Sequence, residues 1–510
     1  MFQTLKRELL AGITVSVVAL PLALAFGMQA TQNSDGAIIG LYGAIITGFF
    51  AALFGGTKGQ VTGPTGPITI IFTGVVASHG IEYAFIAAFL GGLFQIAFGL
   101  LKAGNYLKFI PLPVVSGFMN GIAIIIIMGQ LKYVTGSFMV VLLTIAFMLF
   151  SMKSIKLIPP SLMALILGTI AVILLEKVMP AVHFSLPFIN DFIFFDTVDR
   201  IGEIPKGLPQ LQLPVAEADI ILQLIPAALS IAVLGSIDSL LTSVVMDNMT
   251  GTKHKSNKEL IGQGIGNTLA GLFGAMPGAG ATVRSVVNLR SGGQTVISAM
   301  VHSVALLLFM LVFGSLAEEI PLAVLAGILI ITGVTMFDYD SFKILKDEPR
   351  SDAAVMVVTM VLTVAIDLMV AVGVGIVMSA LIFMKRMSEE GFKMTNKAEG
   401  GLSLYFLEGP LYFGSVEQIT RTITSDNNPH IAIDIAQVTI VDATGALTLL
   451  QLNDQLKERG QNLYLVGNDL DLGGILRKMD IFSRIGHHRH FETMDELNSY
   501  LRKFQMTISS

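Results

Sequence analysis

The chain is long, apolar and poor in charge. It has 510 residues, of which 53% are hydrophobic and 14% are charged, whereas a soluble globular domain carries roughly 25% charged residues. This composition indicates a protein embedded in a lipid bilayer. A net charge of -5 without a Lys/Arg-rich arm excludes nucleic acid as a partner, and the absence of cysteine excludes disulfides, thiolate metal sites and a cysteine nucleophile.

Apolar segments recur along most of the chain. A helix needs about 20 apolar residues to cross about 30 Å of hydrocarbon. We predict fourteen membrane segments, at residues 9–30, 37–54, 65–79, 81–101, 111–130, 137–152, 157–175, 220–246, 259–276, 280–291, 294–316, 321–337, 352–367 and 369–384. Two of them, 65–79 and 280–291, are too short to span the bilayer alone.

The basic residues between these segments predict the topology, because cytoplasmic loops collect Lys and Arg. With the N-terminus inside, most of them fall in inner connections, for example Lys102, Lys253 and Arg350. We therefore expect a multi-pass protein of the plasma (inner) membrane, with its N-terminus and its C-terminal domain in the cytoplasm.

The two short segments follow similar sequences. Residues 51–56 read AALFGG before the first, and residues 270–275 read AGLFGA before the second. The copies lie seven predicted segments apart, and an odd number places them in opposite orientations. The sequence therefore predicts two inverted seven-helix repeats, an arrangement in which transporters build a site at the midplane.

Proline, glycine and threonine interrupt the apolar pattern at VTGPTGPITI, residues 61–70, and GAGAT at 278–282 forms the counterpart. Non-helical backbone survives at membrane depth only where protein or a water-filled cavity satisfies it. We expect a half-helix to start near Gly66, with Thr62 and Thr65 capping free N–H groups. Two such N-termini facing one pocket would favour an anion. The alternative is a pair of ordinary proline kinks.

Ionisable residues within the segments are expensive unless they function. Arg284 lies one turn into the second half-helix and either completes the anion site or snorkels. Asp238 and Thr242 share one helical face and, with exposed carbonyl groups, could hold sodium, or Asp238 could carry a proton. An Asp238–Arg284 ion pair that only locks two helices is the structural alternative. His302 is expected to be a satisfied helix-contact residue.

The composition changes after residue 387. Residues 388–400 form a polar linker, and residues 401–510 alternate short strands with amphipathic helices, which indicates a small soluble α/β domain.

Five motifs resemble one family: ALPLALAFG at 19–27, GPTGP at 63–67, IDSLLTSVV at 237–245, NKELIGQGIGN at 257–267 and VDATG at 441–445. Together they resemble the SulP anion transporters (sulfate permeases, solute carrier family 26) with a C-terminal STAS domain. The resemblance implies an all-α membrane domain over 1–387, divided into core and gate domains as in uracil permeases, and a small cytoplasmic α/β STAS domain over 401–510.

The resemblance also implies roles for individual residues. The substrate would lie beside Phe26 and between the half-helix N-termini, which begin at Thr65 and Gly66 and at Ala281 and Thr282. In sodium-dependent bicarbonate transporters, which the chain resembles most, positions matching Thr65, Ala281 and Thr282 contact the anion. The sodium ligands there match a set of four residues: Asp238, Thr242, Gly280 and Thr282.

Three further residues follow from the resemblance. Many relatives carry glutamine where this chain has Leu22, and Arg284 resembles the arginine of prestin and of sulfate or dicarboxylate permeases. In anti-sigma-factor antagonists related to STAS domains, the residue matching Thr444 is phosphorylated, so Thr444 is a candidate regulatory residue. The alternative is that Thr444 is only a helix N-cap.

We therefore predict a secondary active transporter that takes up bicarbonate with sodium by an elevator-like alternating-access cycle, as a homodimer without an organic cofactor. The alternatives are a sulfate or dicarboxylate permease coupled to protons or sodium, and a passive anion channel or charge-moving motor. A nucleobase permease fits less well. We do not expect an enzyme, because no nucleophile and base occur in a triad-like pattern.

Overall fold

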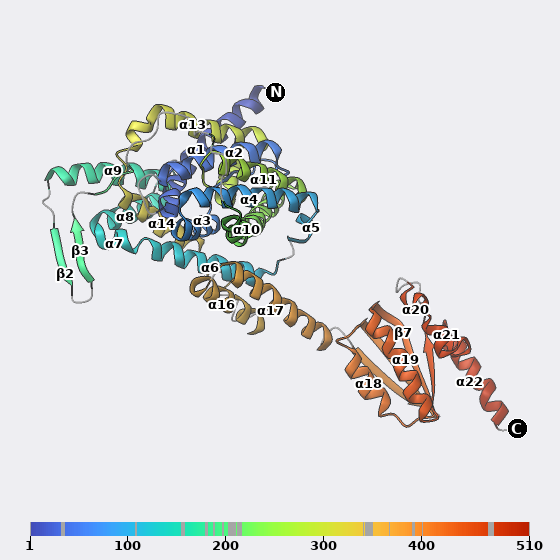
Figure 1. Cartoon of the computed structure of the whole chain (residues 1–510). Coiled ribbons are helices and arrows are strands. Elements are labelled where there is room, and N and C mark those ends of the chain that lie inside the picture. Colours follow the sequence, from blue (N-terminus) through green and yellow to red (C-terminus); the bar gives the residue numbers. More distant parts are fainter. Residues whose placement is uncertain are drawn as a thin grey trace. The chain divides into compact units, whose positions relative to one another are not determined.

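The computed structural model divides the chain into two compact units, residues 1–376 and 377–510, and each is considered by itself (Figure 1). It describes residues 2–31, 36–107, 110–154, 159–178, 182–186, 189–195, 198–201, 211, 217–339, 341, 350–366, 368–389, 393–399, 401–467 and 474–508.

The first unit is helical. Its longer helices are α1 (Phe2–Thr31), α2 (Gly36–Phe54), α3 (Gly66–His79), α4 (Ile81–Leu100), α6 (Leu112–Gly129), α8 (Phe138–Ser154), α9 (Pro160–Val178), α10 (Ala218–Thr250), α11 (Ser256–Leu272), α12 (Thr282–Arg290), α13 (Val296–Ala317), α14 (Leu322–Met336), α16 (Arg350–Ala365) and α17 (Leu368–Glu389), the last of which continues into the second unit. Short helices α5 (Gly104–Leu107) and α7 (Leu131–Gly136) and a hairpin of β2 (Val182–Leu186) and β3 (Ile189–Phe195) lie between them.

A helix lies over each of the predicted membrane segments. Within the described part of the chain, eight helical stretches are long and apolar enough to cross a membrane. Helices α3, α8 and α14 are apolar but shorter. The mostly helical membrane domain is thus confirmed, whereas a full set of fourteen crossings in two inverted repeats stays a prediction.

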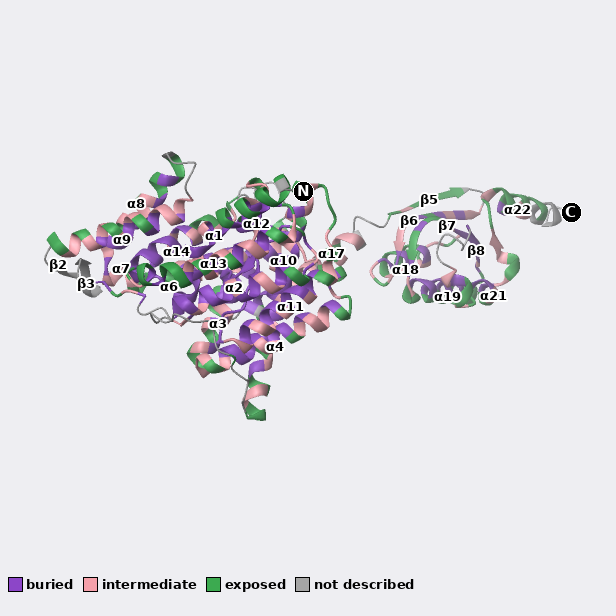
Figure 2. Cartoon of the chain, turned by 90° about the horizontal axis from the view of Figure 1, so that it is seen from above, coloured by how far each residue is buried: buried purple, intermediate pink, exposed green. Residues whose placement is uncertain are grey.

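The helices of the first unit pack in two groups. Helices α1–α4 and α10–α13 contact mainly one another, and α6, α8, α9, α14 and α16 form a second group. Contacts between the groups run chiefly through α1 with α9 and α14 and through α3 with α6. Buried positions concentrate along α2 and α10, while α8 and α9 show more exposed positions (Figure 2). This division agrees with the expected core and gate.

The second unit is an α/β domain. Its five-stranded sheet has the order β5-β6-β7-β8-β9, in which β5 pairs antiparallel with β6 and the other neighbours are parallel. The strands are β5 (Lys393–Glu399), β6 (Leu402–Leu411), β7 (His430–Val441), β8 (Asn462–Val466) and β9 (His490–Phe491), and the helices are α18 (Val416–Thr424), α19 (Ala443–Glu458), α20 (Ile475–Lys478), α21 (Ile481–Ile485) and α22 (Met494–Ile508).

The apolar alternation of the strands explains the core. Ile431, Ile433 and Ile435 of β7 pack on one face of the sheet with α18, α19 and α21, while Ala432 and Leu497 belong to a cluster on the other face. Our expectation of a linker over residues 388–400 is partly wrong, because residues 393–399 form β5 and pair with β6 along their whole length.

Candidate functional site

Two short strands meet inside the first unit. Strand β1 (Thr62–Gly63) pairs antiparallel with β4 (Ala279–Gly280), and the Ala281 N–H donates to the Val61 carbonyl at 2.8 Å. Each strand leads directly into a half-helix, β1 into α3 and β4 into α12. This pairing satisfies non-helical backbone deep inside the protein. The helices are therefore separate half-helices, and the alternative of proline-kinked continuous helices is wrong.

The half-helix N-termini lack side-chain caps. Thr65 at the start of α3 and Ala281 at the start of α12 make no capping hydrogen bond, and the Thr62 hydroxyl accepts a hydrogen bond from Gln263 instead. Our expectation that these two threonines cap α3 is wrong. The first-turn N–H groups without caps are the donors that an anion would need.

The predicted sodium ligands lie together. The Thr242 hydroxyl of α10 donates to the Gly280 carbonyl at 2.9 Å and lies 2.7 Å from the Thr282 hydroxyl. Asp238 stands one turn earlier on α10, close enough to Thr65 for their side chains to interact. Carboxylate, hydroxyl and carbonyl oxygens are the ligands that a hard cation prefers. The structure brings these residues together, and their contact with sodium stays a prediction.

Arg284 lies behind the start of α3. Its side chain is 2% exposed, and its Nη2 donates to the Pro64 carbonyl at 3.1 Å. Among the described residues it forms no ion pair with Asp238, so the alternative of a purely structural ion pair is wrong. Arg284 Nη1 has no hydrogen-bond partner there either. One NH₂ group of a buried guanidinium is thus without a partner in the described structure, beside the half-helix.

Phe26, Gly66 and His302 complete the surroundings. Phe26 is buried on α1, which packs against both half-helices. A Cβ on Gly66 would lie 3.0 Å from side-chain atoms of Ile126 and Met336, so α6 and α14 cover the start of α3. His302 is fully buried, and neither ring nitrogen has a partner within the described ranges. Our expectation of a satisfied histidine is therefore wrong.

A stripe on α11, which we call the α11 polar stripe, holds both broken segments and consists of Glu259, Gln263 and Asn267. Oε2 of the Glu259 carboxylate accepts from the N–H groups of Gly56 and Thr57, both at 2.8 Å. Its Oε1 accepts from Gln60 at 2.9 Å and from Gln263 at 2.8 Å.

The other two stripe residues reach the strands. Gln263 donates to the Thr62 hydroxyl at 2.7 Å. The Asn267 amide accepts from the Gly278 N–H at 2.8 Å and donates to the Gly278 carbonyl at 2.9 Å. A Cβ on Gly278 would lie 2.4 Å from the Gly63 carbonyl oxygen, so only glycine allows this close approach.

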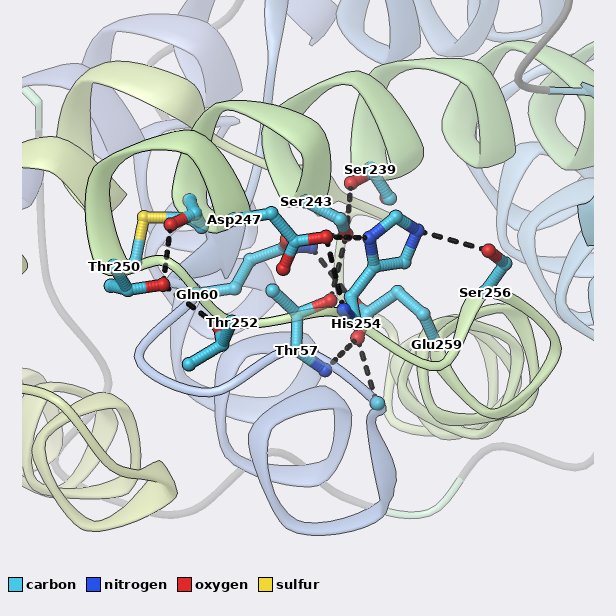
Figure 3. Close-up of polar contacts among 12 residues, drawn as sticks. Thr57, Gln60, Ser239, Ser243, Asp247, Thr250, Thr252, His254, Ser256 and Glu259 are labelled. Carbon is cyan, nitrogen blue, oxygen red and sulfur yellow. Dashed lines mark hydrogen bonds and ion pairs between the residues drawn. The ribbon is translucent and has the colours of Figure 1, made fainter.

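The hydrogen bonds continue from the stripe to α10. Ser243 donates to Gln60 at 2.9 Å and lies 2.7 Å from the Thr57 hydroxyl. Figure 3 shows these residues beside Glu259, with His254 Nδ1 2.7 Å from the Asp247 carboxylate. Sequence reasoning missed this role for α11. The motif NKELIGQGIGN could have indicated the role, because its residues Glu259, Gln263 and Asn267 stand four apart and therefore share one helical face.

Thr444 lies in the second unit, in the first turn of α19. The N-cap is Asp442, whose side chain accepts from the Gly445 N–H at 2.7 Å, so the N-cap alternative for Thr444 is wrong. Its side chain is exposed. A phosphate at a helix N-terminus is electrostatically favourable, and regulation at Thr444 stays a prediction.

Comparison with known proteins agrees with this architecture. The sequence matches the Sulfate permease family over residues 5–138 and 132–359 and the STAS domain over residues 393–497. It is 37% identical to the bicarbonate transporter BicA of Synechocystis sp., over 97% of this chain and 94% of that protein. It is 32% identical to the putative sulfate transporter YvdB of Bacillus subtilis, over 97% of both.

Solved structures are similar as well. The transmembrane domain of a cyanobacterium bicarbonate transporter BicA superposes with a TM-score of 0.65 at 42% identity, covering 73% of this chain and 98% of that one. SLC26A9 superposes with a TM-score of 0.83 at 17% identity, covering 98% of this chain and 90% of that one, which shows a common fold. The chain therefore belongs to the sulfate permease (SulP) family of multi-pass anion transporters and carries a C-terminal STAS domain.

Proposed function

We propose that this protein takes up bicarbonate together with sodium. The observation that carries the proposal is the Thr242 hydroxyl, which bridges the Gly280 carbonyl and the Thr282 hydroxyl. Thr282 is also the first residue of α12. A cation held by these oxygens and Asp238 would add positive charge beside the half-helix N-termini, so sodium and the anion would strengthen each other's binding.

The packing of the helices supports alternating access. The half-helices and α10 belong to one helix group, and the second group touches that group along α1 and α3. A site carried by one group can move past the other without breaking the β1–β4 pair. Transporters built from repeats use such rigid-body motion around a fixed site. The similarity to two proteins named bicarbonate transporter BicA favours bicarbonate.

The test is uptake of labelled bicarbonate into vesicles under an inward sodium gradient. Asp238→Asn should lower sodium-stimulated uptake at least about tenfold, because the cation loses its only charged ligand. Asp219→Asn is the matched control, since Asp219 lies exposed in the first turn of the same helix. Full sodium stimulation of uptake in Asp238→Asn would contradict the proposal. Bicarbonate uptake driven by a proton gradient alone would mean that protons, and not sodium, are the coupled cation.

A sulfate or dicarboxylate permease is the second candidate. The free Nη1 of buried Arg284 favours it, because a fixed cation helps a dianion more than a monoanion. Two similar proteins of Bacillus subtilis are named putative sulfate transporters. If external sulfate is accumulated and excess bicarbonate does not compete, this candidate holds instead.

The remaining expectations belong to the same proposal. We infer a homodimer in the plasma membrane with the N-terminus and the STAS domain in the cytoplasm. Cross-linking in intact membranes and protease access from each side test these two points. Electrical recording separates a transporter from a passive channel, because a channel carries current without accumulating the anion.

A further inference from the structure

Four exposed basic residues gather at one end of the first helix group. We call them the inner basic cluster, and they are Arg7 of α1, Lys58 between α2 and β1, Lys255 before α11 and Arg290 at the end of α12. Helix α12 packs against α1, and Figure 2 shows α12 beside the N-terminal end of the chain. A Cβ on Gly292, two residues after Arg290, would lie 3.7 Å from the Arg7 Cβ. By the inferred topology, this end of the group faces the cytoplasm.

Backbone contacts join the remaining segments of the cluster. The Lys255 N–H donates to the Gly56 carbonyl at 3.2 Å. The Asn288 amide of α12 donates to the Gly59 carbonyl at 2.8 Å. Both carbonyl groups belong to the connection that carries Lys58, so this connection lies between α11 and α12. The fold therefore fixes the four cations near one another.

Acidic residues beside the cluster do not neutralise it. Glu8 is 1% exposed and accepts from the N–H groups of Gln294 at 2.9 Å and Ser298 at 3.2 Å. Glu259 accepts the four hydrogen bonds described above, and the Asp247 carboxylate lies 2.7 Å from an imidazole Nδ1. Within the described ranges, none of the four basic side chains forms an ion pair. The charge that this surface presents is therefore positive.

Helix stability does not explain the lysines near α11. Lys255 is the N-cap of this helix and makes no side-chain capping bond, and Lys258 lies in the first turn. Positive charge at a helix N-terminus opposes the helix dipole and is unfavourable. Cations that work against their own helix indicate an anionic partner outside it.

Exposed apolar residues adjoin the cluster on α1. Leu5, Leu9 and Ile13 are 43%, 42% and 50% exposed, and residues four apart share one helical face. This stripe begins beside Arg7 and runs into the membrane-spanning part of α1. Cations that border an apolar stripe at the end of a membrane helix match a phospholipid, which combines an anionic phosphate with apolar chains. A free inorganic anion has no use for the stripe.

We propose that the inner basic cluster binds the headgroups of anionic phospholipids in the cytoplasmic leaflet. All four cations belong to the helix group that carries the half-helices, so the headgroups anchor this group at the membrane surface. The inference rests on the topology inferred under the proposed function and goes beyond it, because it holds whichever anion is transported.

The test is native mass spectrometry of the purified full-length protein titrated with phosphatidylglycerol or phosphatidylcholine. The Kd for the first phosphatidylglycerol should be at least about fivefold lower than that for phosphatidylcholine, which is the effect of about one cation at the surface. Higher salt should reduce this preference. The fourfold variant Arg7→Gln, Lys58→Gln, Lys255→Gln and Arg290→Gln should bind both lipids within about twofold of each other.

Two control variants isolate the cluster. Lys58→Arg with Lys255→Arg keeps the charge and should keep the preference, whereas Lys58→Gln with Lys255→Gln should lower it, which repeats the test with fewer changes to the fold. A second fourfold variant removes exposed cations from other places and should also keep the preference: Lys102→Gln, Lys132→Gln, Lys153→Gln and Lys177→Gln.

Three results would overturn the proposal. Equal affinity of the unmodified protein for the two lipids means that no headgroup is selected. Equal loss of preference in both fourfold variants means that overall charge, and not the cluster, attracts the lipid. Displacement of phosphatidylglycerol by an equal concentration of inorganic phosphate means that the cluster binds a free anion. Because lipid binding is measured without transport, absence of bicarbonate uptake would reject the proposed function and leave this result standing.

Discussion

The α11 polar stripe and the surroundings of the half-helix starts differ in how completely their polar groups are paired. Along the α11 polar stripe, the Glu259 carboxylate accepts four hydrogen bonds and the Asn267 amide holds Gly278 from both sides. Around the half-helix starts, by contrast, Arg284 Nη1 and both ring nitrogens of His302 have no partner among the described residues, whereas on the stripe this holds for Gln263 Oε1 alone.

The difference separates positioning from binding. Paired groups fix the backbone that they hold, because moving it would break several hydrogen bonds at once. Unpaired groups cost stability in the empty protein and regain it when a ligand arrives. We infer that the stripe keeps β1 and β4 in register, while the unpaired groups around the half-helix starts are available to a ligand. Substitutions in the stripe should therefore lower stability more than transport affinity, and substitutions around the half-helix starts should do the reverse.

The largest effect is expected for Glu259→Gln. The substitution turns one carboxylate oxygen into an NH₂ group that faces existing N–H donors, inside a residue that is 2% exposed. Breaking such a buried network costs about 3–5 kcal/mol. Thermal unfolding of the purified protein should show a strongly lowered Tm, and uptake should be lost.

Glu82→Gln provides the control, because Glu82 is an exposed acidic residue in the first turn of α4. It should leave the Tm unchanged. A Tm for Glu259→Gln equal to that of the control would show that the stripe does not hold the strands.

The next effect is expected for Gly278→Ala. A Cβ there would lie 2.4 Å and 2.5 Å from the carbonyl oxygen and carbon of Gly63, and backbone must move to make room. Overpacking of this kind costs about 1–3 kcal/mol. Because the shift separates β1 from β4, sodium-driven uptake should fall more steeply than the Tm. Gly74→Ala, where nothing lies within 4 Å of the added carbon, should change neither.

A smaller loss of stability is expected for Thr242→Val. The valine removes the hydroxyl that bonds the Gly280 carbonyl, at a cost of about 1 kcal/mol. The sodium concentration for half-maximal uptake should rise at least about tenfold, because a ligand of the cation is gone. Thr242→Ser keeps the hydroxyl and should restore sodium dependence. If valine and serine behave alike, Thr242 does not bind sodium.

The sequence predicted the half-helices because their cause is local. Pro64 and Pro67 lack the N–H group that the interior of a helix needs, so a helix can begin at this segment but cannot run through it, and the break before α3 follows from residue types. The neighbours Asp238 and Thr242 followed from helical spacing. The pairing of Thr62 with Gly280 links positions far apart in the chain, and spacing alone does not contain it.

Two glutamines show the limit of that reasoning. Gln29 lies near the end of α1 and Gln130 at the end of α6, and each alone resembles an ordinary helix terminus at the membrane surface. Both are nevertheless buried in the fold, which the sequence pattern does not reveal. The alternative of an Asp238–Arg284 ion pair failed for a similar reason, since the partner of Arg284 is the Pro64 carbonyl and not a charged side chain. Main-chain partners leave no signature in residue types.

The smallest effect is expected for Gln29→Met, and Gln263→Met gives the comparison. Both replace a buried amide with an apolar side chain of similar length. Gln263 loses hydrogen bonds to Thr62 and Glu259, which costs about 2–3 kcal/mol. Gln29 loses an oxygen that had no partner in the described structure, so its unfolding free energy should change by less than about 0.5 kcal/mol or rise. Thermal and denaturant unfolding measure both. Equal destabilisation would mean that the Gln29 amide is paired as firmly as the Gln263 amide, and the stripe would not differ from other buried amides in how it holds the fold.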